Sequence, residues 1–198
     1  MTSCKEAIKD IEVDGKVAVE SEEVRLCPIS NMKPLIAKMD NSLSTLKKCK
    51  QLRMSSNAIQ KIEGLAGMDS LTILSLGRNA LKKIEGLNEV ADTLEQLWIS
   101  YNQIASFAGI EKLLNLQVLF ASNNKIDKWP EVERLQALPK LRDCNLTNNP
   151  LYVKHMEAEV RPPPRSALPA AGPGWGARLP RRRALCSPPL CARESPVA

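Results

Sequence analysis

The sequence predicts an α/β solenoid, a segment of a horseshoe whose short parallel strands line the concave face. Two observations predict it. Five times, two aliphatic or small apolar residues stand two positions apart and are followed three residues later by asparagine. These asparagines are separated by 22, 23, 22 and 25 residues, and they are Asn57, Asn79, Asn102, Asn124 and Asn149. The pattern LxxLxLxxNxL with a period of about 20–29 residues is typical of leucine-rich repeats. We therefore expect five such repeats over residues 46–152.

Each part of the repeat has a physical cause. Alternating apolar residues place two side chains on one face of a short strand and the residue between them on the other. The asparagine side chain can bond backbone groups that the following turn leaves unpaired, which would otherwise cost on the order of 1–3 kcal/mol each. The second half of a repeat predicts a helix or short 3₁₀ turn that covers the back of the core. Its apolar pairs are Ile62 with Leu65, Ile84 with Leu87, and Phe107 with Ile110.

The two ends of the solenoid differ. Residues 1–45 predict a helical cap and an irregular first coil, because Ser3-Cys-Lys-Glu6 is a capping box ahead of apolar residues at helical spacing. At the other end, residues 153–160 allow a short helix that Pro162-Pro-Pro164 must stop. Residues 161–198 hold nine of the fourteen prolines with Arg and Ala, which predicts a disordered tail. The change is abrupt enough that an alternative exon or intron read-through is a second explanation.

The charge balance narrows the class of function. The net charge is +6, but residues 161–198 contain seven Arg and one acid, so residues 1–160 are neutral. A basic groove for nucleic acid on the fold is therefore disfavoured. No apolar run approaches the roughly 18 residues of a membrane helix, and Lys and Glu interrupt the first thirty residues. We expect a cytoplasmic, soluble protein without membrane contact.

The residues that carry enzyme chemistry are not assembled in this sequence. The six cysteines have no CxxC spacing, and His155 is the single histidine, so neither a metal, a cofactor nor a disulfide framework is expected. No GxxxxGK phosphate loop occurs. Asp127, Glu131 and Glu133 are interpreted as a solvated helix start. We expect a protein that is not an enzyme.

The strand residues that point away from the core predict where a partner binds. Three of the seven aromatic residues, Trp98, Tyr101 and Phe120, fall at such positions, where the fold does not require them. Exposed apolar patches of this kind mark protein-interaction sites. A charged residue at the edge suits an amphipathic helix as the partner. The candidate binding residues are Ile73, Arg78, Gln96, Trp98, Tyr101, Val118 and Phe120.

At these residues the sequence resembles the leucine-rich-repeat light chain 1 family of axonemal outer-arm dynein. The most specific segment is Ala91-Asp-Thr-Leu-Glu-Gln-Leu-Trp-Ile-Ser-Tyr-Asn-Gln-Ile104, and Ile73-Leu-Ser-Leu-Gly-Arg-Asn79 adds to it. The resemblance implies a subunit without catalytic activity that binds the dynein heavy chain at the microtubule-binding tip of its stalk and tunes ciliary beating. It also implies tubulin contact, and localisation to the cytoskeleton of the cilium or flagellar axoneme.

The resemblance ends near Tyr152. Family members continue with a terminal helix and a Leu-rich cap, where this chain enters its Pro/Arg segment, so the implied tubulin contact is weaker here. Two alternatives remain open. A phosphatase-regulatory scaffold shares the repeat period but would need an acidic or polar concave face. A spliceosomal-type protein beside RNA is motivated only by the arginines of the tail.

Overall fold

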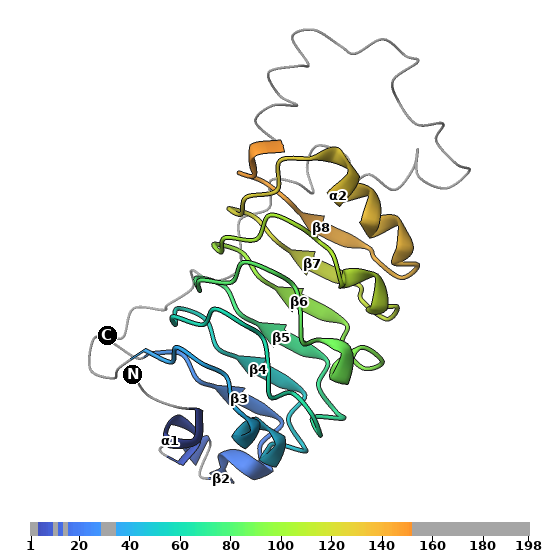
Figure 1. The fold of residues 1–198 in the computed structure, drawn as a ribbon. Helices are drawn as coiled ribbons and strands as arrows, with labels where there is room; N and C mark the ends of the chain where they lie inside the picture. The colour runs from blue at the N-terminus through green and yellow to red at the C-terminus, as the bar shows by residue number, and fades with distance from the viewer. Residues whose placement is uncertain (1–3, 10–11, 14–15, 29–34, 152–198) are drawn as a thin grey trace, which may run out of the picture.

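The computed structural model describes residues 4–9, 12–13, 16–28 and 35–151. Within them the chain winds into stacked coils, and each coil adds one strand to a single six-stranded parallel sheet (Figure 1). Strand order follows the sequence without crossovers. The strands are β3 (Glu23–Arg25), β4 (Gln51–Arg53), β5 (Ile73–Ser75), β6 (Gln96–Trp98), β7 (Val118–Phe120) and β8 (Asp143–Asn145). The sequence-predicted leucine-rich-repeat solenoid is confirmed, while the expected helix at 153–160 and the tail at 161–198 lie outside the described residues.

The strands are in strict register, because equivalent residues of neighbouring repeats pair directly. Leu52 pairs with Leu74, Leu74 with Leu97, and Leu97 with Leu119. All four side chains are fully buried. Each coil therefore contributes the same inward residue to one continuous core, and burial of these aliphatic side chains is the main stabilising contribution of the stack.

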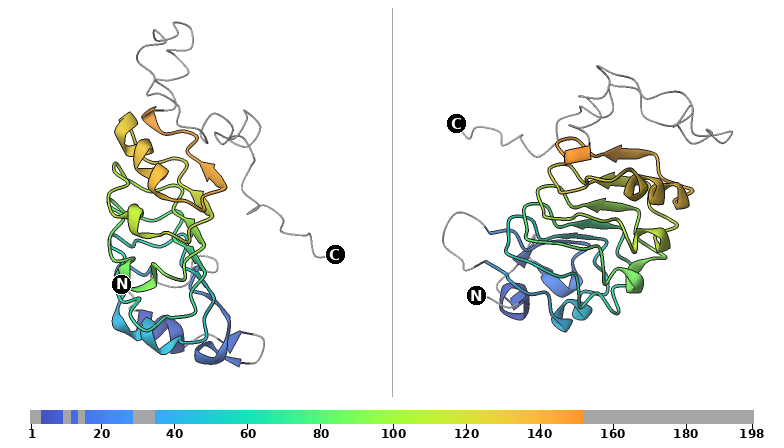
Figure 2. Two further views of the ribbon diagram at one scale, coloured as in Figure 1. Left: turned by 90° about the vertical axis from the view of Figure 1, so that its right-hand side faces the viewer. Right: turned by 45° about the horizontal axis from the view of Figure 1, so that its top comes forward.

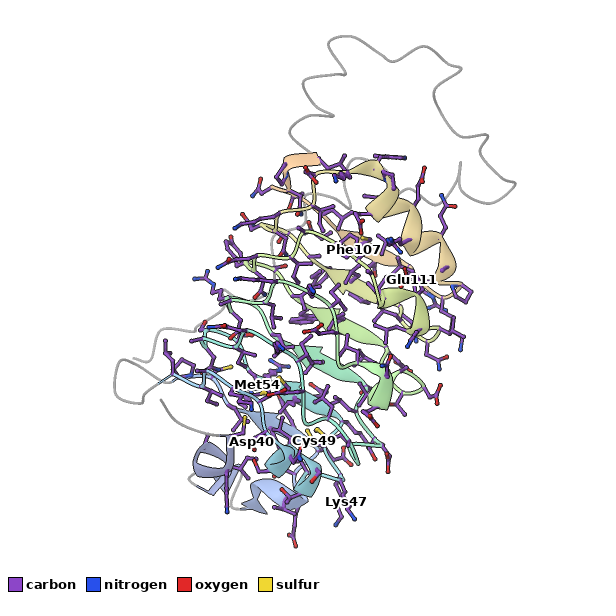
Figure 3. All side chains as sticks on the ribbon, in the orientation of Figure 1. Asp40, Lys47, Cys49, Met54, Phe107 and Glu111 are labelled. Atoms are coloured by element: carbon purple, nitrogen blue, oxygen red, sulfur yellow. The ribbon has the colours of Figure 1, made fainter. Side chains whose placement is uncertain are left out.

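Short helical segments form the back of the solenoid, opposite the strands (Figure 2). Between them lies the interior, in which Phe107 is the largest fully buried side chain (Figure 3). These segments are η3 (Asn88–Val90), η4 (Ile110–Lys112), α2 (Trp129–Glu133) and η5 (Arg134–Ala137). The sequence-based prediction of a helix or short 3₁₀ turn holds at the pairs Ile84 with Leu87 and Phe107 with Ile110, but not at Ile62 with Leu65, because the coil between β4 and β5 contains turns and no helical segment.

The amino end of the stack is closed by helix α1 (Cys4–Lys9), which packs beside the 3₁₀ helix η2 (Asn41–Thr45). Ser3 of the expected capping box lies outside the described residues. Asp40 is the N-cap of η2: burial favours its neutral form, but hydrogen bonds from Ser42 and from the N–H groups of Lys5 and Cys4 outweigh burial and lower its pKa. The remaining elements of this end are the antiparallel pair β1 (Glu12–Val13) and β2 (Lys16–Val17), and η1 (Ala18–Glu20).

Strand β3 is a difference from the sequence-based expectation of an irregular first coil. Glu23–Arg25 pairs in parallel register with β4, and Val24 is fully buried next to Leu52. The repeat pattern gave no sign of this strand, because the position of the ladder asparagine is occupied by Ile29 in the sequence. No helix in the part of the chain that the structure describes has the length and apolarity needed to cross a bilayer.

Candidate functional site: the concave face

The strand-lined concave face is shaped by the asparagine ladder beneath its edge. In the turn after β6, the Asn102 side-chain oxygen accepts a hydrogen bond from the N–H of Leu81 at 3.0 Å. Its amide nitrogen donates to the carbonyls of Leu76 and Ile99, both at 3.0 Å. Because these backbone groups belong to two successive coils, each asparagine joins one turn to the previous one. The structure places the same arrangement at Asn57, Asn79, Asn124 and Asn149.

The residue before each ladder asparagine has a left-handed backbone conformation. All five φ angles lie between 54° and 61°. Gly and Asn tolerate this region best, whereas bulky side chains there are uncommon. Two of the five positions nevertheless carry large side chains. The five residues are Ser56, Arg78, Tyr101, Asn123 and Asn148.

Trp98 and Phe120 form the centre of the concave face. They pair directly across β6 and β7, and their ring centroids are 5.6 Å apart with the planes inclined by 47°. Both side chains are half-buried, as are the flanking Ile73, Gln96 and Val118 on the same three strands. A tilted aromatic pair at this distance is attractive beyond the area it buries. The structure thus brings together five of the seven candidate binding residues in adjacent strands.

The other two candidates, Arg78 and Tyr101, meet at the edge of this face. The Arg78 guanidinium carbon lies 5.0 Å from the centroid of the Tyr101 ring, a cation–π geometry. Both side chains are exposed, and Tyr101 is 48% accessible. Each residue stands three positions after an outward-facing strand residue, so the pair borders the Trp98–Phe120 centre at the end of the strands.

Two features of the face differ from what the sequence suggests. Ser75 occupies an outward strand position between Arg53 and Trp98, yet it is buried and its hydroxyl lies 2.9 Å from that of Ser55. The indole Nε1 of Trp98 is also buried, and among the described residues it has no hydrogen-bond partner. Neither feature has a signature in the sequence, because both depend on which neighbouring side chain covers the polar atom.

Charge on the concave face lies toward its two ends, with the exposed Asp143 of β8 at the carboxyl end and three charged residues at the amino end. Glu23 lies 2.9 Å from the Arg25 guanidinium and 3.1 Å from that of Arg53, so one carboxylate serves two arginines. Arg78 belongs to a middle repeat and is exposed at the edge of the face. It has no carboxylate within ion-pair distance in the described residues. The middle of the face is therefore apolar and aromatic, with one cation at its edge.

The sequence predicts that the acidic residues at the start of α2 are solvated, and for Glu131 this prediction is wrong. Its carboxylate accepts hydrogen bonds from the Ser106 hydroxyl at 2.7 Å and the Phe107 N–H at 2.8 Å. It also lies 3.3 Å from Arg134, which in turn contacts Glu111 at 2.7 Å. Burial would raise the pKa of Glu131, but these partners outweigh it and lower the pKa. Through the bonds to Ser106 and Phe107, Glu131 connects α2 to the preceding coil.

Three of the four described cysteines, Cys4, Cys49 and Cys144, are packing residues. Burial raises the pKa of Cys4 and of Cys49 to about 11, and that of Cys144 to about 12, so these thiols stay protonated at neutral pH. Reactive or metal-binding cysteines need the opposite shift. Nowhere in the described residues do three His, Cys, Asp or Glu side chains gather as a metal site would require.

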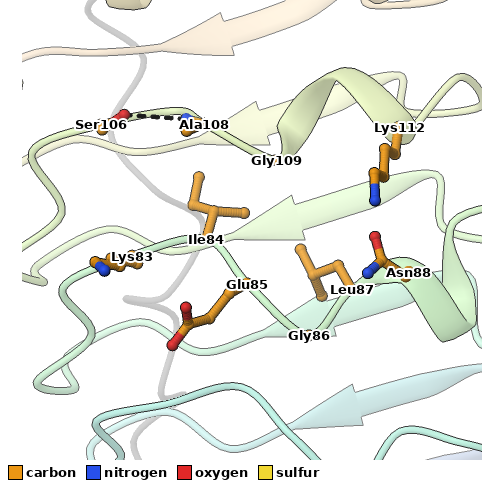
Figure 4. A pocket seen from close by; sticks show the side chains of 10 residues that line it. All are labelled: Lys83, Ile84, Glu85, Gly86, Leu87, Asn88, Ser106, Ala108, Gly109 and Lys112. Atoms are coloured by element: carbon orange, nitrogen blue, oxygen red, sulfur yellow. Dashed lines mark hydrogen bonds between the residues drawn. The ribbon is translucent and has the colours of Figure 1, made fainter.

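A shallow groove on the back of the solenoid is the other concavity of note (Figure 4). It lies between two successive coils, with Ile84 and Leu87 on one and Ala108 and Gly109 on the next. Lys83, Glu85 and Lys112 add charges of both signs at its border. The groove brings neither a nucleophile–base pair nor two carboxylates together, so its lining offers no catalytic arrangement.

The stacked coils and their parallel sheet define a leucine-rich-repeat protein, and such repeats indicate a protein-interaction role. A family model described as Leucine Rich repeats (2 copies) matches residues 92–134. A crystal structure of an internalin from Listeria monocytogenes superposes with a TM-score of 0.53 at 24% identity, covering 58% of this chain and 33% of that one. This likeness supports the fold alone.

Sequence comparison identifies the family within that class. The Chlamydomonas reinhardtii protein Dynein axonemal light chain 1 is 57% identical over 157 residues, which cover 79% of this chain and 78% of that protein. The Homo sapiens protein of the same name is 44% identical over 155 residues, covering 78% and 80%. The chain belongs to the axonemal dynein light chain 1 family, which confirms the resemblance seen in the sequence. Membership places the chain at the axoneme, in the cytoskeleton of the cilium or flagellum.

Proposed function

We propose that this chain is a non-catalytic subunit that binds an outer-arm dynein heavy chain, at the stalk region that carries its microtubule-binding tip, through the concave face. By occupying that region the subunit tunes attachment of the motor and so ciliary motility. The observation that carries the proposal is the half-buried Trp98–Phe120 pair at the centre of the face, in a family whose members are named for axonemal dynein. Aromatic anchors at the centre of an interface provide much of its binding free energy.

The apolar character of the face supports a partner helix. Ile73, Val118 and the two aromatic rings lie on three adjacent strands, and this surface fits the apolar stripe of an amphipathic helix. The phosphatase-regulatory alternative would use an acidic or polar face, which the centre of this surface does not offer. We make no proposal about tubulin contact, because the resemblance ends near Tyr152, where the family's terminal helix and cap would follow.

The test is a binding titration of the full chain against a recombinant stalk-tip fragment of an outer-arm dynein heavy chain. Trp98→Ala should weaken binding by roughly 2–4 kcal/mol, about 30- to 1000-fold in Kd. Trp129→Ala is the matched control, because Trp129 is an exposed tryptophan at the start of α2, away from the concave face. Circular dichroism should show that both variants keep the wild-type secondary structure.

Two outcomes would overturn the proposal. Equal affinity of Trp98→Ala and wild type would exclude the concave centre as the binding surface. Recovery of a phosphatase catalytic subunit without dynein, in a pull-down from ciliated cells, would favour the phosphatase-regulatory alternative instead.

A further inference from the structure

The edge of the concave face holds two large side chains in a backbone conformation that does not suit them. Arg78 has φ 54° and Tyr101 has φ 58°, in the turn position where neighbouring repeats carry Ser56, Asn123 and Asn148. Asparagine lowers the strain of this left-handed conformation with a short polar side chain, and serine does so more weakly, whereas Arg and Tyr have no such side chain. Strained backbone positions that keep an unsuitable residue are often functional.

The fold gains little from either side chain. Both are exposed, and in the described part of the chain the two side chains interact with each other. A solvent-exposed cation–π contact is weak, and the backbone N–H groups of both residues are already bonded to the carbonyls of Ser100 and Ser122, whatever the side chain. The two residues are therefore explained better by something that binds them than by folding.

The positive charge of Arg78 indicates the chemistry of the group that binds the two side chains. Of the five arginines in the described residues, Arg25, Arg53 and Arg134 each have a carboxylate within 3.3 Å, whereas Arg78 and the exposed Arg142 do not. What distinguishes Arg78 is its place over the Tyr101 ring, 5.0 Å from the centroid, together with the exposure of its side chain to solvent. A guanidinium held in this way is suited to a carboxylate that accepts two parallel hydrogen bonds.

We propose that Arg78 and Tyr101 form a receptor for an Asp or Glu of the bound partner, and that the partner element is an amphipathic helix with this carboxylate next to its apolar stripe. The proposal rests on the proposed function, because the stripe is what lies on Trp98 and Phe120. Tyr101 follows Trp98 by three residues in the same coil, so an element seated on the two rings passes the receptor. The pair then selects among apolar helices the one that carries an acid at the right place.

The experiment measures the Kd of the stalk-tip fragment for the full chain at several salt concentrations. Arg78→Gln should weaken binding about tenfold and flatten the salt dependence, because an oriented ion pair is lost. Tyr101→Asn should weaken binding severalfold while raising the melting temperature, because asparagine suits the left-handed backbone. Lys83→Gln, which removes an exposed cation at the groove on the back of the solenoid, is the matched control and should leave Kd and its salt dependence unchanged.

The partner carboxylate is identified by replacing each Asp and Glu of the fragment with its amide. One replacement should weaken binding about tenfold in the wild type and have almost no further effect in Arg78→Gln. Wild-type affinity and salt dependence in Arg78→Gln, together with weak binding of Trp98→Ala, would overturn this inference and leave the proposed function standing. A melting temperature lowered by Tyr101→Asn would show that the pair serves the fold, and absence of binding by the wild type would overturn both proposals.

Discussion

Inside the coils, each ladder asparagine bonds backbone groups of two successive turns, whereas on the concave face the Trp98 indole N–H is buried with no partner among the described residues. The same contrast holds for the backbone. Glycine stands in the turns that need its conformation at the back of the solenoid, yet Arg78 and Tyr101 stand in left-handed turns at the front. The interior is thus optimised for folding and the face is not. Substitutions should separate stability from binding along this division.

The turns at the back of the solenoid should show the largest effect on stability. Gly86 has φ +78°, and a Cβ added there would lie far inside van der Waals contact of the Ile62 carbonyl oxygen of the previous coil. Gly86→Ala combines a strained backbone with a steric overlap that the packed coils cannot relieve, so we expect a loss of about 4 kcal/mol of unfolding free energy. Urea unfolding followed by circular dichroism measures it.

Two other glycines serve as matched controls for this substitution. Gly67 has φ +81°, but its added Cβ would be 3.7 Å from the nearest atom, so Gly67→Ala should lose only the conformational part, about 1 kcal/mol. Gly77 lacks the positive φ and its Cβ would come no closer than 3.4 Å, so Gly77→Ala should change stability by less than about 0.5 kcal/mol. Equal losses at all three positions would show that the close approach of the coils is not what requires glycine.

The asparagine ladder should give the next largest effect. Asn102→Ala leaves the buried Leu81 N–H without an acceptor and removes the donor to the Leu76 and Ile99 carbonyls, so we expect a loss of roughly 2–4 kcal/mol in urea unfolding. Asn88→Ala replaces an exposed asparagine in η3 and should be nearly neutral. A small loss at Asn102, comparable to that at Asn88, would mean that water reaches the ladder.

The repeats and the asparagine ladder could be predicted from the sequence, because a core built of identical coils requires the same residue types at a regular spacing along the chain. Each buried strand position repeats Leu or a similar residue, and each turn repeats Asn. Strand β3 could not be predicted in this way. Val24 is buried next to the inward leucine of the following strand, but no ladder asparagine follows it in the sequence. The left-handed backbone at Arg78 could not be predicted either. The turn sets this conformation, whereas arginine as a residue type favours negative φ.

The candidate site could be foreseen only as a set of positions. Strand alternation places Trp98 and Phe120 on the outward face, and the structure adds their mutual contact at 5.6 Å. The burial of Ser75 and the bonds of Glu131 depend on distances between neighbouring coils. Alternation within one strand contains no information on these distances. The burial of Ser75 at an outward position and the hydrogen bonds of Glu131 could therefore not be predicted.

Trp98→Phe should give the smallest effect on stability, and with the opposite sign. Phenylalanine keeps an aromatic ring over Phe120 and removes an N–H that the fold buries without a partner. An unpaired buried donor costs about 1–3 kcal/mol, part of which is offset by the smaller apolar area of Phe, so we expect a gain of about 1 kcal/mol and a melting temperature higher by about 2–4 °C. Trp129→Phe, where the tryptophan does have an interaction partner, should give no such gain. A lower melting temperature for Trp98→Phe would mean that the indole belongs to the stabilising interior, and the division between an optimised core and a face kept for binding would then not hold at its central residue.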